Sequence, residues 1–337
     1  MKRLFLIAIT LFTSLTSTVA QSSDTVNIYS FRQPFLIEPI LEKFTAETGI
    51  KTKVVFSKKG LIERLKREGK YSPADVVLTS DFNKLLQLKT EGLTQKIDSN
   101  LVNDIVPSQF RDEGDHWIAL TKRARGLYVS KNSSVDTSTV KYEDLSDKRF
   151  AGKVCTRSGK HPYNLGLIAS MIAHHGEADT ESWLKGVKSN LARKPQGNDR
   201  GQVKAIKEGL CEISLGNSYY FGKMLTDEKQ KPWADAVNLV FPNQKDRGAH
   251  INVSGAVITK HAPNKDNAKK LLAYLVDESA QQQYASLNME YPVNPAVSAS
   301  KMVLSWGSFK EDSLPLTEIA KYREQALKLV DKVKFDL

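Results

Sequence analysis

The sequence lacks the features that mark common classes of membrane protein and enzyme. Beyond residue 20 it has no apolar run long enough to cross a bilayer. It has no Gly-x-Gly-x-x-Gly segment, P-loop, Gly-x-Ser-x-Gly elbow or His-Glu-x-x-His pair, and its six histidines show no catalytic spacing. We therefore expect a protein that is neither membrane-embedded nor an enzyme. A catalytic set formed only in three dimensions stays open as an alternative.

Basic residues are in excess, yet they form no pattern for binding nucleic acid. The chain has 49 Lys and Arg against 38 Asp and Glu, a formal net charge of +11. These cations are scattered among acids, without a basic stripe interleaved with aromatic residues, so we expect no nucleic-acid partner. The positive charge instead favours an anion or a negatively charged partner surface.

The N-terminus has the pattern of a secretory signal peptide. Lys2 and Arg3 precede a short apolar run, and Thr18-Val19-Ala20 fits a cleavage site before Gln21. No cysteine lies near this point, so we expect no lipid anchor. Residues 1–20 are thus predicted to be removed, which leaves a mature exported chain of about 317 residues, enough for two domains.

The two cysteines, Cys155 and Cys211, are predicted to form a disulfide. An even number of cysteines in an exported chain favours a bridge, which would stabilise the fold by about 4 kcal/mol on the chain-entropy estimate. A zinc site is the weaker alternative, because the histidines lack paired spacing with both cysteines.

Alternating strands and helices predict an α/β fold with two doubly wound domains. In the first domain we expect strands at 26–30, 50–56 and 74–79, and helices at 36–48, 60–68 and 82–90. Extended segments at 117–121 and 125–130 are predicted to cross into the second domain, which has a strand at 211–215 and helices at 163–174, 180–190, 202–208 and 218–228. A strand at 251–258 and helices at 265–287 and 316–333 follow. Two lobes joined by more than one crossing imply a cleft for a ligand between them.

We assign residues 21–122 plus 248–298 to an N-terminal lobe, and residues 123–247 plus 299–337 to a C-terminal lobe.

Three tyrosines stand at predicted strand-to-helix junctions. Tyr219 and Tyr220 open one helix, and Tyr163 opens another 56 residues upstream. At a first helical turn both neighbouring rings can reach one point in a cleft, and a phenolate is a hard anionic ligand that suits trivalent iron. The sequence therefore predicts a hard-metal site, with ordinary packing of half-buried tyrosines as the alternative.

Several segments resemble the periplasmic ferric-iron-binding proteins, the substrate-binding components of ferric ABC importers. The resemblance is carried by Ile28-Tyr29-Ser30-Phe31-Arg32-Gln33-Pro34, Pro73-Ala74-Asp75-Val76, Asn217-Ser218-Tyr219-Tyr220, Asn252-Val253-Ser254-Gly255, Ala262-Pro263-Asn264 and Glu290-Tyr291-Pro292-Val293. It runs from about Val26 to the C-terminus. It implies a two-lobed periplasmic-binding-protein fold of the type II kind, related to transferrin lobes.

The resemblance also implies a ligand set. The family's iron-binding tyrosines fall on Tyr163, Tyr219 and Tyr220, whereas the His-Tyr pair that many members have in the N-terminal lobe is here Gln33-Pro34. Proline cannot ligate a metal, so the sequence resembles the branch that holds iron with tyrosines of one lobe plus an anion.

That anion is expected to be carbonate or bicarbonate, for which a planar arginine fork is a suitable partner. We expect Arg32 and Arg125 to bind it, with Gln33 as a further donor. Tyr29 is expected to pack in its strand, and Lys223 at most to add positive charge behind the ligands.

The function implied is that of a monomeric periplasmic protein that binds Fe(III) between its lobes and delivers it to an inner-membrane ABC permease. One alternative keeps the fold and binds a small organic anion, such as a phosphonate or a sugar phosphate, with the arginines as the main contacts. Another is an exported enzyme on a two-lobed scaffold.

Overall fold

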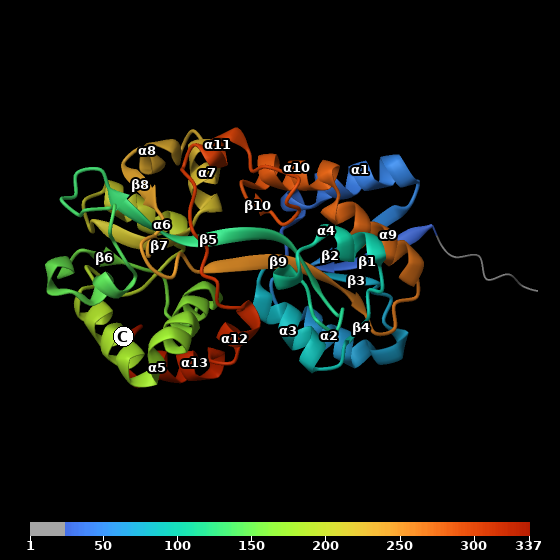
Figure 1. The fold of residues 1–337 in the computed structure, drawn as a ribbon, viewed down its shortest axis with the longest axis horizontal. Coiled ribbons are helices and arrows are strands. Elements are labelled where there is room, and N and C mark those ends of the chain that lie inside the picture. Colours follow the sequence, from blue (N-terminus) through green and yellow to red (C-terminus); the bar gives the residue numbers. More distant parts are fainter. Residues whose placement is uncertain (1–23) are drawn as a thin grey trace, which may run out of the picture.

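The computed structural model describes residues 24–337, so the predicted signal peptide at 1–20 lies outside the described residues (Figure 1). The strands are β1 (Thr25–Ser30), β2 (Lys51–Phe56), β3 (Val76–Thr79), β4 (Thr94–Gln95), β5 (Ile118–Ser130), β6 (Val154–Cys155), β7 (Ile213–Asn217), β8 (Val237–Val240), β9 (Ile251–Thr259) and β10 (Tyr291–Pro292). The α-helices are α1 (Glu38–Thr48), α2 (Leu61–Glu68), α3 (Phe82–Thr90), α4 (Asn100–Ile105), α5 (Pro162–Ser189), α6 (Asp199–Lys207), α7 (Tyr219–Leu225), α8 (Lys231–Ala234), α9 (Lys265–Val276), α10 (Glu278–Asn288), α11 (Lys301–Leu304), α12 (Leu316–Ala320) and α13 (Arg323–Lys332). Short 3-10 helices lie at Pro34–Leu36, Gly69–Tyr71, Ser108–Phe110, Glu143–Ser146 and Lys148–Phe150.

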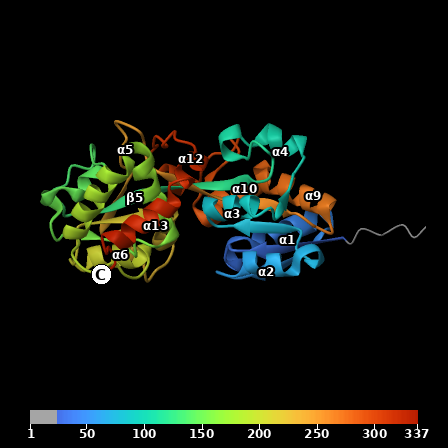
Figure 2. The ribbon, with the colours of Figure 1, turned by 90° about the horizontal axis from the view of Figure 1, so that it is seen from below.

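The elements gather into two lobes, each an α/β unit with its own hydrophobic core. Figure 1 shows α1 to α4, α9 and α10 around one lobe and α5 to α8 and α13 around the other, and Figure 2 shows the narrow waist between them. One core joins buried side chains at 26–120 and 251–293, and another joins side chains at 127–335. This is the α/β architecture of two lobes joined by crossing strands that the sequence predicts.

Strands β5 and β9 connect the lobes. The strands run in the order β2-β1-β3-β9-β5-β7-β6, with β1 parallel to both β2 and β3 and with β6 parallel to β7. The first half of β5 pairs with β9, and residues from Arg125 onward pair with β7 instead. The two extended segments predicted at 117–121 and 125–130 are therefore one strand of 13 residues that passes from lobe to lobe.

The helices differ from the prediction chiefly where they end. The predicted helix 265–287 is divided at Asp277, whose side chain caps α10 by accepting a hydrogen bond from the Ala280 N–H at 2.8 Å. The predicted helix 316–333 is two helices, α12 and α13. Helix α5 runs through both predicted helices 163–174 and 180–190, with a break in its backbone at Gly176 (φ 80°).

The structure gives no helix within residues 24–337 that has both the length and the apolar character needed to cross a membrane.

Candidate metal centre

Two strand-to-helix junctions lie side by side in the lobe built around the second core. Strands β6 and β7 are parallel, with Cys155 opposite Ser214, so their carboxyl ends meet at the same edge of the sheet. The chain after β6 enters α5 at Pro162, and the chain after β7 enters α7 at Tyr219. The predicted disulfide between Cys155 and Cys211 is confirmed and ties β6 to the segment that enters β7.

The structure brings the three predicted tyrosines to one place. Tyr163 is the second residue of α5, and Tyr219 and Tyr220 are the first two of α7. The phenol oxygens of Tyr163 and Tyr219 are 3.5 Å apart, and the ring centroids of Tyr219 and Tyr220 are 4.1 Å apart. His161 caps α5 and orients its first turn, since its Nδ1 accepts a hydrogen bond from the Tyr163 N–H at 3.2 Å. Helix α7 is shorter than predicted, and its capping residue Ser218 makes no side-chain cap bond.

All three rings line a cavity of about 740 Å³ between the lobes. Its walls come from the loops after β1, β2 and β3 on one side and from the starts of α5, α6 and α7 on the other. Three carboxylates line it, those of Asp81, Asp227 and Glu290. The lining cations are Arg32, Lys58, Lys59, Lys84, Arg123, Arg157, Arg200 and Lys223. The cavity is thus positively charged overall, as a site for an anion or for a cation held by phenolates would be.

The phenols in this cavity are harder to ionise than free tyrosine. Burial raises the pKa of Tyr219 well above its usual 10, and the neighbouring Tyr163 and Tyr220 raise it further. Burial also raises the pKa of Tyr220 to about 12. Both groups therefore keep their protons at neutral pH unless a strongly polarising cation stabilises the phenolate.

Arg32 and Gln33 both line the cavity, as an anion-binding role requires, but Arg32 already has a partner. The side chain of Arg32 is buried and forms an ion pair with Glu290, whose Oε2 lies 2.8 Å from Nη2. Thr121 donates a further hydrogen bond to Glu290 at 3.0 Å. Gln33 is exposed at the rim, next to Pro34. The positive charge of Arg32 is therefore largely balanced before any ligand binds.

Arg125 lies behind the tyrosines and is not among the residues that line the cavity. Its guanidinium donates to Asp199 at 2.6 Å, to Asn217 at 3.0 Å and to Asn164 at 2.6 Å. Its Cζ is 5.9 Å from the centroid of the Tyr163 ring. The structure thus places this predicted anion-binding residue beneath the site, and its hydrogen bonds are directed at the protein.

The prediction from sequence missed three arginines that do face the cavity. The guanidinium of Arg157 lies 5.4 Å from the Tyr163 ring, that of Arg123 lies 6.0 Å from the same ring, and that of Arg200 lies 5.8 Å from the Tyr220 ring. The available signal was position: Arg157 follows the end of β6, where parallel strands present their ligand-binding ends, and Arg200 lies in the first turn of α6.

His161, also missed, lines the cavity beside Tyr163, with ring centroids 4.6 Å apart. Burial, together with the positive charge of Arg157, lowers the pKa of His161 to about 3. The imidazole is therefore neutral over the working pH range and adds no charge to the cavity.

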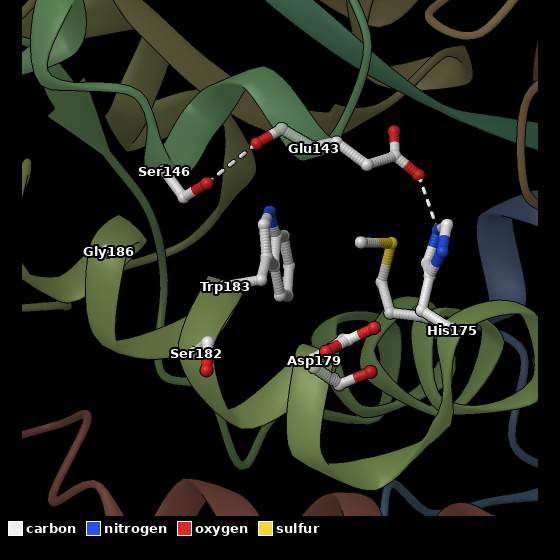
Figure 3. A pocket seen from close by; sticks show the side chains of 9 residues that line it. Glu143, Ser146, His175, Asp179, Ser182, Trp183 and Gly186 are labelled. Carbon is white, nitrogen blue, oxygen red and sulfur yellow. Dashed lines mark hydrogen bonds and ion pairs between the residues drawn. The ribbon is translucent and has the colours of Figure 1, made fainter.

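A second hollow, of about 340 Å³, lies in the same lobe but contains none of the three tyrosines (Figure 3). Glu143 at its edge lies 2.8 Å from His175 and accepts hydrogen bonds from Arg247 and Asn243. Across residues 24–337, no group of three or more His, Cys, Asp or Glu side chains is arranged to hold a metal ion. The tyrosine cavity is therefore the candidate metal centre.

Comparison with known proteins shows the family to which the chain belongs. Residues 71–310 match the family model described as bacterial extracellular solute-binding protein. The chain is 39% identical to iron uptake protein A1 of Synechocystis sp., over 98% of this chain and 97% of that protein. Its fold matches the apo ferric ion-binding protein A of Pasteurella haemolytica with a TM-score of 0.89, at 52% identity over 93% of this chain and 99% of that one. It also matches the Trichodesmium protein IdiA or FutA, solved in complex with iron and citrate ligands, with a TM-score of 0.87, at 40% identity over 92% and 99% of the two chains.

Proposed function

The chain belongs to the bacterial extracellular solute-binding proteins, in the branch of the ferric-iron-binding proteins, and from this premise we propose that it binds Fe(III) through Tyr163, Tyr219 and Tyr220. The observation that carries the proposal is the meeting of these three phenols in a basic cavity between two lobes. Three phenolates balance the charge of Fe(III) and supply three hard oxygen ligands of an octahedral shell.

An anion completes the shell in this proposal, and carbonate is the first candidate. Carbonate can occupy two neighbouring positions on the metal and needs a positive partner. Arg32 and Gln33 lie on one wall, and Arg157 lies over the Tyr163 ring on the other. Arg125 contributes from behind the tyrosines through its charge. A cavity of about 740 Å³ also has room for a larger oxyanion such as citrate, which is bound with iron in the Trichodesmium relative.

We further propose that the protein works as a monomer in the periplasm, after removal of residues 1–20, and delivers iron to an inner-membrane ABC permease. The relatives named above are iron-uptake and iron-binding proteins, which supports this role over an enzymatic one. A hinge movement about β5 and β9 would open and close the cavity between the lobes.

The test is to add Fe(III) to the purified mature protein with bicarbonate, with citrate, or with neither anion. A visible phenolate-to-iron charge-transfer band is expected, and the anion that supports it identifies the shell. The matched variants are Tyr219→Phe with Tyr220→Phe, which should abolish the band, and Tyr71→Phe, an exposed tyrosine that should not affect it. A band that survives the double substitution would sink the assignment of these ligands.

Calorimetry with organic anions in metal-free buffer addresses the alternative of an anion-binding protein. The proposal expects no tight binding of phosphonates or sugar phosphates under these conditions. Tight binding, together with no iron band, would favour the alternative.

A further inference from the structure

We propose that Asp199 and Arg125 form a brace that positions the three tyrosines by tying the start of α5 to the start of α7; this inference rests on the proposed function and adds positioning residues to it. Neither residue lines the cavity, so both act through the groups that they hold.

Asp199 is the fixed point of the brace. It is the first residue of α6 and is fully buried. One carboxylate oxygen lies 2.6 Å from Arg125 Nη1 and accepts the N–H of Asn217 at 3.0 Å, and the other oxygen accepts from Arg157 Nη1 at 3.1 Å. A single carboxylate thus contacts β5, the end of β7 and the loop after β6.

Arg125 extends from this point to both tyrosine-bearing junctions. Its Nη1 donates to the side chain of Asn217, two residues before Tyr219, at 3.0 Å. Its Nη2 donates to the side chain of Asn164, the residue after Tyr163, at 2.6 Å. Because the guanidinium is planar and rigid, the two nitrogens hold the two junctions at a set separation. Tyr163 and Tyr219, whose phenol oxygens are 3.5 Å apart, stand at these two junctions.

The partners of Asn164 and Asn217 continue the brace into the loops. The side-chain nitrogen Nδ2 of Asn164 donates to Thr156 Oγ1 at 3.0 Å and to the backbone carbonyl oxygen of Arg157 at 3.0 Å. The carbonyl oxygen of Asn217 accepts a hydrogen bond from the Tyr128 hydroxyl at 2.8 Å. The brace therefore fixes backbone as well as side chains at both junctions.

Asp199 also orients a cation at the site. Arg157, which it holds, faces the cavity 5.4 Å from the Tyr163 ring. Asp199 thus holds two arginines, of which only Arg157 lines the cavity. The Asp199 carboxylate keeps both guanidinium groups in place next to the two tyrosine-bearing junctions.

The test compares Asp199→Asn and Arg125→Lys with a matched control, Asp75→Asn. The first variant keeps the shape of the side chain but removes its charge, and the second keeps the charge but removes the fork. Asp75 is also a fully buried carboxylate, which accepts hydrogen bonds from the N–H groups of Asn27 at 2.8 Å and Asn264 at 2.6 Å, and it does not line the cavity. All three variants are expected to unfold at lower urea concentration than the wild type.

Only the brace variants should change the iron site. Lost support for metal ligands typically costs about 10- to 100-fold in affinity, and we expect a loss of this size for both, measured by competition with a chelator. Their charge-transfer band should be weaker per bound iron and shifted, because fewer phenolates reach the metal. Asp75→Asn should keep the wild-type band and affinity. If the band and affinity of both brace variants match the wild type, the brace has no positioning role.

Crystal structures of the metal-free proteins separate this inference from the proposed function. The brace predicts that the distance between the Tyr163 and Tyr219 phenol oxygens increases in Asp199→Asn and Arg125→Lys and is unchanged in Asp75→Asn. A wild-type protein without any iron band would contradict the proposed function, yet these distances would still decide the brace. Unchanged distances in both brace variants would overturn it. If Asp199→Asn does not fold, Arg125→Lys decides by the same two measurements.

Discussion

At the scale of single residues, the protonation of the phenols sets how iron binding depends on pH. Burial raises the pKa of Tyr220 to about 12 and raises that of Tyr219 as well. Each of these two groups therefore carries its proton at pH 7, and on the proposed function it must release that proton to become a metal ligand. Because protons and iron compete for the same oxygens, affinity falls as pH falls throughout the range below these pKa values. The pair alone contributes about a 100-fold loss per pH unit, tenfold for each proton.

The protons can be counted directly. In weakly buffered solution, addition of chelated Fe(III) to the wild type should release protons, with correction for those taken up by the chelator. Tyr220→Phe should release about one proton fewer per bound iron. Tyr71→Phe, at an exposed position, should match the wild type. Equal release by Tyr220→Phe and wild type would show that Tyr220 does not bind the metal as phenolate.

The three tyrosines could be predicted to meet, but the partners of the arginines could not. Adjacent tyrosines at a helix start are visible in the sequence, and so is a third at another junction. Whether Arg32 or Arg125 can bind a ligand depends on Glu290 and Asp199, which are 258 and 74 residues away along the chain. Such pairs form only when segments far apart in the sequence fold together within each lobe, and no local pattern records them.

At the scale of elements, the disulfide is expected to contribute stability rather than to shape the iron site. It joins residues 56 apart, for which the chain-entropy model predicts about 4 kcal/mol. Replacing Cys155 and Cys211 together by alanine should lower the free energy of unfolding by about 2–4 kcal/mol, measured in urea. The iron band should persist at 25 °C, since β6 and β7 remain paired in parallel. Wild-type protein treated with a reductant is the control and should unfold at the same urea concentration as the double variant. If the double variant instead unfolds like the oxidised wild type, the prediction is contradicted.

Elements with strong local signals were predicted well, and those set by long-range pairing were not. Helix α5 breaks at Gly176 and α1 ends at Gly49, and both glycines have a positive φ, of 80° and 73°. Glycine is a helix-ending residue that can be recognised in the sequence itself. The continuity of β5 has no such signal, because its second half is held by β7 and β8, which lie far along the chain. The cap at Asp277 lies inside a stretch of helical apolar periodicity, which hides the boundary between α9 and α10.

At the scale of the whole molecule, α7 links the candidate metal centre to the other lobe. It carries Tyr219 and Tyr220, and its Lys223 donates a hydrogen bond to the carbonyl oxygen of Leu287 in the last turn of α10. Helix α10 belongs to the first core, so this bond joins the two lobes. Gly222 packs so closely that an added Cβ would lie 2.6 Å from Met289 Cγ. Movement of the lobes and movement of the ligands are therefore mechanically connected.

We accordingly expect Lys223→Met to loosen the contact between the lobes without removing a proposed metal ligand. The substitution keeps the apolar stem of the side chain but removes the donor, and one such hydrogen bond contributes about 0.5–1.5 kcal/mol. Iron captured by a chelator should therefore leave the variant about 2- to 10-fold faster than the wild type. Small-angle scattering should show a larger radius of gyration for the metal-free variant. Lys229→Met, at an exposed position just beyond α7, is the matched control and should leave both quantities unchanged. Equal release rates and equal radii for Lys223→Met and wild type would mean that α10 is not held by this bond, and that closure depends on other contacts between the lobes.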